Sequence, residues 1–266
     1  MHSTQDVNKL LCVRALRIES ATHTLVHDLN FELAQGQTLA IVGESGSGKS
    51  ISSLAILGLL PSSLQVFGQI QFQGQNLLTL KAAQLRQIRG RKIAMIFQEP
   101  MTALNPLHRV ERIIGESLSL QGLSPHQTRE RVLALLKDVG IDQPEHKLKR
   151  YPHELSGGQR QRVMIAMALA QDPEILIADE PTTALDVTLQ AQILDLLKRL
   201  QQQRNMAMIL ISHDLNLVRR YADDLVVMQH GHVLEQGSVH EIFTQPKHLY
   251  TQNLLDHDFG QALQVQ

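Results

Sequence analysis

The sequence contains a single cysteine, Cys12, among its 266 residues. One cysteine excludes a disulfide bond within the chain, and it excludes a zinc or iron–sulfur site whose ligands are all cysteines of this chain. An excess of either charge is also missing, because 25 Lys and Arg residues stand against 26 Asp and Glu residues. This balance argues against a broadly basic surface, and we therefore expect no nucleic-acid partner.

Long apolar runs are absent as well. No uncharged stretch approaches the ~20 apolar residues with which a helix crosses a bilayer. The N-terminal segment MHSTQDVNK lacks the basic start and the apolar core of a signal peptide. We therefore expect that the chain neither enters nor crosses a membrane, and the single cysteine suits a reducing cytoplasm. With 43% hydrophobic residues, the composition is that of a globular protein with a large core.

Strand and helix patterns alternate along the chain. After a β-rich start, apolar runs predict buried strands at 38–42, 92–98, 174–179 and 207–212. Apolar residues at helical spacing predict helices at 127–140 and around 189–200. A further helix is predicted from Ser50 to a stop at Pro61, and a hairpin is predicted at 224–237. Strands that alternate with helices favour an α/β fold with a mostly parallel sheet.

The stretch GESGSGKS matches the phosphate-loop pattern and lies between an apolar strand and a helix, as that pattern requires. Its residues are Gly43, Glu44, Ser45, Gly46, Ser47, Gly48, Lys49 and Ser50. The backbone N–H groups of such a loop surround a phosphate, Lys49 reaches the β- and γ-oxygens, and the Ser50 hydroxyl is a ligand for Mg²⁺. The alternative is a glycine-rich turn with an incidental lysine.

Two carboxylates end the apolar segment ILIADE. The carboxyl end of a parallel strand is the edge at which α/β sheets bind ligands, so we expect Asp179 and Glu180 beside the phosphate loop. Asp179 would belong to the Mg²⁺ shell, and Glu180 would polarise the attacking water. Taken alone, the pair would more often be a solvated strand end.

A second predicted anion site lies in LSGGQRQR, residues 155–162. Adjacent glycines at the start of a helix leave backbone N–H groups free to bind an anion. The alternative is an internal helix cap, with the RQR segment on a solvated face.

These motifs together resemble the ATPase domains of ATP-binding cassette (ABC) transporters, whose signature is LSGGQ. In that family two ATPase domains close head to tail, so the resemblance implies that Ser156, Gly157, Gly158 and Gln159 clamp the γ-phosphate held by a second domain. It also implies that Gln98 reaches Mg²⁺ and the attacking water, that Asp186 lies in the loop that crosses the dimer interface, and that His213 contacts the γ-phosphate. An N-cap for the following helix is the other reading of Asp186.

The resemblance implies a P-loop NTPase fold, with a RecA-like core, an antiparallel β element and an inserted helical subdomain at about 99–165. The ATPase domain would span 1–258, and 259–266 would be a polar tail or the start of a linker. The implied activity is hydrolysis of ATP with Mg²⁺ as cofactor. One family feature is missing: RIESATHTL has no aromatic residue near Ser20 to stack on the adenine, and its only ring belongs to His23.

The phrases IFQEPMTALNPL and PKHLYTQNLL are similar to those of bacterial peptide and nickel importers. The chain is most similar to the N-terminal half of a tandem ATPase subunit of the microcin C uptake type. Iron–sulfur clusters found in this branch need more cysteines than this chain has. The implied partners are a second ATPase domain, which can be a fused C-terminal half, integral membrane permease subunits that dock on the loop after Gln98, and indirectly an extracytoplasmic solute-binding protein.

The implied location is the cytoplasmic face of the inner membrane. Peptides are the expected solute, a nickel or other metal importer is the alternative, and a soluble ABC ATPase of DNA repair or translation is a second one. A regulatory nucleotide-binding module without turnover is a third, which Glu180 and His213 disfavour. The sequence leaves open whether the chain is a natural short subunit or a piece of a longer tandem protein.

Overall fold

The computed structural model describes residues 9–183 and 185–262. The chain divides into two compact units. Unit 1 combines the segment up to Arg86 with the segment from Ala207 onward, and unit 2 is Gln87–Met206.

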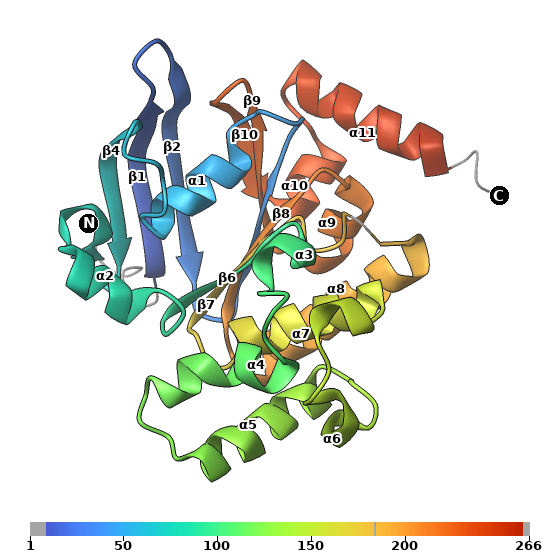
Figure 1. Ribbon diagram of the computed structural model, residues 1–266. Helices are drawn as coiled ribbons and strands as arrows, with labels where there is room; N and C mark the ends of the chain where they lie inside the picture. Colours follow the sequence, from blue (N-terminus) through green and yellow to red (C-terminus); the bar gives the residue numbers. More distant parts are fainter. Residues whose placement is uncertain (1–8, 184, 263–266) are drawn as a thin grey trace. The chain divides into compact units, whose positions relative to one another are not determined.

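An antiparallel sheet forms the first part of unit 1. Its strands are β1 (Lys9–Glu19), β2 (Thr24–Ala34), β4 (Gln65–Phe72) and β5 (Gln75–Asn76). They pair in the order β5-β4-β1-β2, of which β4, β1 and β2 are labelled in Figure 1. Along β1 the buried residues Leu11, Val13, Leu16 and Ile18 occupy one face, with a shift at a bulge near Ala15. This alternation, which the sequence showed, reflects a strand with one face in the core.

The second part of unit 1 contains the strands β3 (Thr38–Val42), β8 (Ala207–Ser212), β9 (Asp224–Gln229) and β10 (His232–Ser238). β3 is parallel to β8 on one side and to β9 on the other, and β9 and β10 form the predicted antiparallel hairpin. All residues of β3 and β8 are buried. A continuous apolar run is what a parallel strand covered on both faces requires, which is why the sequence identified these strands.

Four helices accompany these strands, namely α1 (Lys49–Ile56), α9 (Leu215–Tyr221), α10 (Val239–Thr244) and α11 (Leu249–Ala262). The short helices η1 (Leu77–Thr79) and α2 (Ala82–Ile88) follow β5. The sequence predicted that the first helix would continue to Pro61, and this was wrong. α1 ends at Ile56 because Gly58 takes a left-handed conformation with φ of +60°, which closes the helix with a C-terminal turn.

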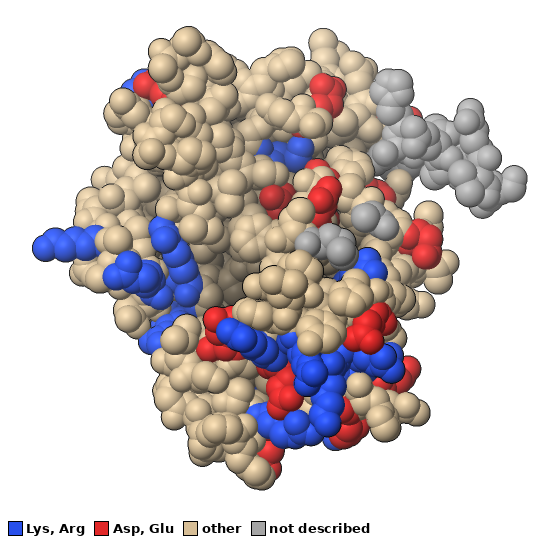
Figure 2. Space-filling view, in the orientation of Figure 1, with Lys and Arg blue, Asp and Glu red and all other residues tan. Residues whose placement is uncertain are grey.

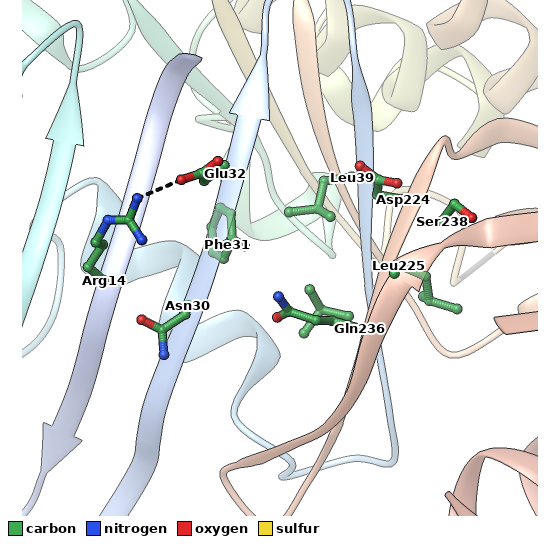
Figure 3. A pocket seen from close by; sticks show the side chains of 11 residues that line it. Arg14, Asn30, Phe31, Glu32, Leu39, Asp224, Leu225, Gln236 and Ser238 are labelled. Atoms are coloured by element: carbon green, nitrogen blue, oxygen red, sulfur yellow. Dashed lines mark hydrogen bonds and ion pairs between the residues drawn. The ribbon is translucent and has the colours of Figure 1, made fainter. Parts of the chain in front are cut away.

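β2 and β10 are joined by one residue pair, His27 and His232, whose rings stack with centroids 3.9 Å apart. In the same unit, a cavity of about 370 Å³ is lined by residues of β1, β2, β3, β9 and β10 (Figure 3). Its charged groups already have protein partners. Arg14 pairs with Glu32 at 2.7 Å, and the Asp224 carboxylate accepts a hydrogen bond from Gln37. We therefore assign no ligand to this cavity.

Unit 2 contains the parallel strands β6 (Ile93–Ile96) and β7 (Ile175–Asp179). Its helices are α3 (Pro100–Ala103), α4 (Val110–Ser119), α5 (Pro125–Asp138), α6 (Pro144–Lys147), η2 (Pro152–Glu154), α7 (Gly157–Ala168) and α8 (Val187–Gln203). α4, α5 and α7 pack against one another through buried residues such as Ile114, Val132 and Leu136. Over this helical region basic and acidic side chains are intermixed (Figure 2), as in the ion pairs Arg129–Glu111 and Arg150–Glu154.

Two predicted boundaries can be compared with these elements. The helices α3 to α7 cover Pro100–Ala168, whereas unit 2 also includes β6, β7 and α8, so a separate helical subdomain at 99–165 stays a prediction. The predicted tail at 259–266 begins within α11, and residues 263–266 lie outside the described residues. Every helix in the described part of the chain is too short or too polar to span a membrane.

Gly68 gives a test of this architecture. Its φ is +97°, and an added Cβ would lie 2.3 Å from the backbone oxygen of Ala15 at the β1 bulge. We expect Gly68→Ala to lower the free energy of unfolding by about 2 kcal/mol or more, because backbone strain and a clash with backbone add together. Gly74→Ala is the matched control, since Gly74 has φ of +78° with no atom within 4 Å of the added Cβ. Strain alone should cost the control about 1 kcal/mol. Urea unfolding of both variants measures the difference, and equal losses would contradict the packing at Gly68.

Candidate functional site

The phosphate loop of unit 1 connects β3 to α1. Three of its glycines have positive φ: Gly43 at 148°, Gly46 at 79° and Gly48 at 104°. A Cβ on Gly43 would lie 2.0 Å from the backbone oxygen of Met228, so no larger residue fits there. Gly48 is the N-cap of α1 and has no side chain that could accept hydrogen bonds from the first N–H groups of the helix. These groups are therefore oriented to bind an anion.

Lys49 is buried, with 5% of its surface exposed. Its ammonium group donates to the backbone oxygens of Gly43 at 2.7 Å and Glu44 at 2.8 Å. A buried ammonium needs such partners, because an uncompensated charge is costly to desolvate. The lysine is thus held over the loop rather than extended into solvent, and its role in a phosphate site stays a prediction.

The tip of the loop is accessible. Glu44, Ser45 and Gly46 are exposed, whereas Ser47 is buried and its backbone oxygen accepts a hydrogen bond from the N–H of Gly231 at 3.0 Å. The β9–β10 turn therefore fixes the base of the loop, and the residues at its tip are exposed to solvent.

His213 lies at the same edge of unit 1. β3 and β8 are parallel, and Val42 pairs with Ser212. Gly43 and His213 follow directly on this pair, so the start of the phosphate loop and the exposed histidine leave adjacent strand ends. Asp214 then caps α9 by accepting the N–H groups of Asn216 and Leu217.

In unit 2 the same parallel geometry joins Gln98 and Glu180. Ile96 pairs with Ala178, and each site residue follows two positions later. The amide of Gln98 donates to Oε2 of Glu180 at 2.8 Å. The hydroxyl of Thr183 donates to the same oxygen at 2.7 Å. The Glu180 carboxylate is therefore oriented by two donors.

Glu180 also has a backbone φ of +44°, an uncommon conformation for a residue with a side chain. Such strain tends to occur at functional sites, where the surrounding structure holds it in place. The preceding residue, Asp179, ends β7 and is 7% exposed.

The signature segment forms the start of α7. Ser156 is the N-cap, and it forms a capping box with Gln159: its hydroxyl accepts the N–H of Gln159 at 3.3 Å, and the Gln159 side chain accepts the N–H of Ser156 at 3.2 Å. The structure thus contains the helix cap that the sequence offered as an alternative. The N–H groups of Gly157 and Gly158 precede the first intrahelical bonds, so a cap does not exclude anion binding there.

Asp186 lies near the signature segment. Both border a cavity of about 530 Å³ in unit 2, together with Arg162 and Leu189. Asp186 is the N-cap of α8 and accepts the N–H of Leu189 at 2.9 Å. Asp186 therefore has the N-cap role that the sequence offered as one reading. Its side chain is exposed, and its role at a dimer interface stays a prediction.

Sequence reasoning missed several residues at these sites. Gln161 belongs to the RQR segment, but it is 2% exposed and donates to the backbone oxygen of Pro181, one residue after Glu180. Thr183 follows Glu180 by three positions, a spacing that could have suggested the contact between them. Tyr250 lies in the segment PKHLYTQNLL, far from the phosphate loop in sequence. Its hydroxyl nevertheless accepts the N–H of Glu44.

Comparisons with known proteins agree with this geometry. The ABC transporter family model matches residues 26–183, and the chain belongs to that family. The chain is 48% identical to the oligopeptide transport ATP-binding protein OppD of Bacillus subtilis, covering 94% of this chain and 72% of the relative. It is 54% identical to the peptidoglycan transport ATP-binding protein YejF of Agrobacterium fabrum, over 94% of this chain and 47% of the relative. A YejF protein of Escherichia coli is 52% identical, with 46% of its length covered. The chain thus spans about half the length of these two YejF relatives.

Solved structures show the same α/β fold of an ABC ATPase cassette. The cbiO1 protein of Clostridium perfringens, part of the ABC transporter complex cbiONQ, is 28% identical with a TM-score of 0.79, and 97% of this chain and 99% of that chain are covered. A dimeric ATP-binding cassette in a post-hydrolysis state with ADP and Pi is 27% identical with a TM-score of 0.75, over 86% of this chain and 98% of that chain. The P-loop NTPase fold that the motifs indicated is confirmed.

Asp186→Ala tests the cap at the start of α8. Removing the carboxylate leaves the N–H of Leu189 without its acceptor, and we expect a loss of about 1 kcal/mol in the free energy of unfolding. Asp186→Ser restores an acceptor at the N-cap and should recover most of the loss. Thermal unfolding of the two variants provides the measurement, and an unchanged midpoint for Asp186→Ala would show that the cap contributes nothing.

Proposed function

We propose that the chain binds ATP with Mg²⁺, hydrolyses it to ADP and phosphate, and thereby powers import of peptides through a membrane permease. The observation that carries this proposal is the phosphate loop of unit 1, whose buried Lys49 is held at the loop carbonyls by hydrogen bonds of 2.7 and 2.8 Å. Loop amides and Lys49 provide the positive potential that phosphate oxygens require.

The donor set fits a magnesium ion. Ser50, Gln98 and Asp179 offer hydroxyl, amide and carboxylate oxygens, which are the hard ligands that Mg²⁺ prefers. When bound, the ion would neutralise charge on the phosphates and supply electrostatic stabilisation. Asp179 is suited to this role because it ends β7 with its side chain largely buried and so has a restricted orientation.

Glu180 is the proposed base. Its carboxylate would accept a proton from the water that attacks the γ-phosphate, and Gln98 and Thr183 hold the carboxylate in place by donating to Oε2. We propose that Gln98 also reaches the attacking water, and that His213 donates to the γ-phosphate from the strand end next to the phosphate loop. These roles follow from the family motifs and agree with the geometry inside each unit.

The signature segment is proposed to act on a second ATPase domain. In that arrangement Ser156, Gly157, Gly158 and Gln159 present the N-terminus of α7 to the γ-phosphate held by the phosphate loop of the other domain. The dimeric cassette among the solved structures supports this proposal. The second domain can be another copy of this chain, a related subunit, or a fused second half, since the YejF relatives are about twice as long as the matched region.

Peptides are the proposed solute, because relatives named for oligopeptide and dipeptide transport are 48% to 52% identical to this chain. We propose docking of the permease on residues 99–108, where the apolar Leu107 is 82% exposed. The protein would then lie at the cytoplasmic face of the membrane and act with an extracytoplasmic binding protein. Chemical energy would reach the permease as a domain movement.

Glu180→Gln tests the catalytic assignment. The amide keeps the size of the side chain but cannot accept the proton, so ATP hydrolysis should fall by ~10²-fold or more. ATP binding should persist, and an ATP-stabilised dimer should accumulate in gel filtration. Glu130→Gln, on the exposed face of α5, is the matched control and should hydrolyse ATP at the wild-type rate. Normal hydrolysis by the Glu180 variant would exclude this residue as the base.

The composite site predicts a dependence on protein concentration. If the signature segment completes a site on a second chain, isolated chains should be largely monomeric without ATP. Turnover per chain should then rise as the protein concentration increases through the micromolar range. Steady-state ATPase assays over a dilution series measure this, and a rate strictly proportional to concentration would contradict action in trans.

A further inference from the structure

Tyr250 connects the C-terminal helix of unit 1 to the phosphate loop. It is the second residue of α11, and its hydroxyl accepts the backbone N–H of Glu44 at 3.3 Å, although 206 residues separate the two. Glu44 follows Gly43 at the start of the phosphate loop and is the only acidic residue between Gly43 and Ser50. The contact therefore holds the first turn of the loop from outside the motif.

Burial raises the pKa of Tyr250, and the charge of the Glu44 carboxylate adds to the rise, whereas the Glu44 backbone N–H opposes it. The phenol therefore stays protonated at neutral pH, and it accepts the Glu44 N–H as a neutral hydroxyl.

Two further features fix the position of Tyr250. The Glu235 carboxylate on β10 accepts the N–H of Lys247 at 2.9 Å and that of His248 at 3.1 Å, just before α11 begins. The Tyr250 ring packs against a buried cluster that includes Ala40 and Val42 of β3. Val42 directly precedes the phosphate loop, so the same core that places the loop also places the hydroxyl.

We propose that Tyr250 is a positioning residue for nucleotide binding. Its hydroxyl holds the backbone N–H of Glu44, so the loop is ordered before phosphate arrives and less conformational freedom is lost on binding. The proposal rests on the proposed function only for the identity of the ligand. The contact itself is a property of the nucleotide-free protein.

Tyr250→Phe tests the proposal, because it removes the hydroxyl and keeps the ring that packs on the core. In the nucleotide-free protein, amide hydrogen exchange at Glu44, measured by NMR, should become faster. Dissociation constants for ATP and ADP should rise about two- to tenfold, as expected for the loss of one hydrogen bond. The kcat at saturating ATP should stay within about twofold, since uniform binding is removed and not stabilisation of the transition state.

Tyr151→Phe is the matched control. Tyr151 lies in unit 2, and its hydroxyl accepts a hydrogen bond from the Arg109 guanidinium at 3.4 Å. This variant should leave both the exchange rate of the Glu44 amide and the nucleotide affinities unchanged. Equal effects of the two substitutions would overturn the proposal, because the response would then not depend on the contact with Glu44.

Two outcomes separate this inference from the proposed function. Unchanged exchange at Glu44 in Tyr250→Phe, or unchanged ATP affinity despite faster exchange, overturns the positioning role. Failure of the wild-type protein to bind ATP would instead contradict the proposed function, and the exchange comparison would still report whether the contact orders the loop.

Discussion

The burial of β3 is the constraint on which the phosphate site of unit 1 depends. All five residues of this strand are 3% exposed or less, and the strand is hydrogen-bonded to β8 on one side and β9 on the other. A strand held in this way has a fixed end, and the loop that follows inherits its position. The histidine after β8, the turn after β9 and the hydroxyl of Tyr250 all approach the loop because they are attached to this same core.

The two proposed anion sites would use the same physical principle in different ways. Each lies at a helix N-terminus, where backbone N–H groups and the helix dipole favour negative charge. At α1 the N-cap is Gly48, and no side chain competes for the first N–H groups. At α7 the capping box of Ser156 and Gln159 stabilises the helix without a ligand. The loop at α1 is instead stabilised by Lys49, whose ammonium bonds to its carbonyls.

The carboxylate of Glu180, the proposed base, is held in place by neighbouring groups. Gln98 and Thr183 donate hydrogen bonds to the same oxygen of Glu180. The buried amide of Gln161 donates to the backbone oxygen of Pro181, the residue after Glu180. A base that is already oriented loses little entropy when the substrate binds, which is the usual advantage of preorganisation. The positive φ of Glu180 is an unfavourable backbone conformation, and this hydrogen-bond network holds the residue in it.

The sequence by itself determined the strands of the core, because the continuous apolar runs of β3, β7 and β8 are stable only when they are buried. It also determined the motif residues, because the spacing within each motif is local. It could not determine where α1 ends, since the left-handed turn at Gly58 competes with a run of helix-forming residues. It also could not show that Gln161 is buried or that Tyr250 reaches Glu44, because these contacts join segments 20 and 206 residues apart. A local sequence pattern indicates the propensity and the periodicity of a segment. Long-range contacts depend on how helices and strands pack, and only the tertiary structure decided these contacts.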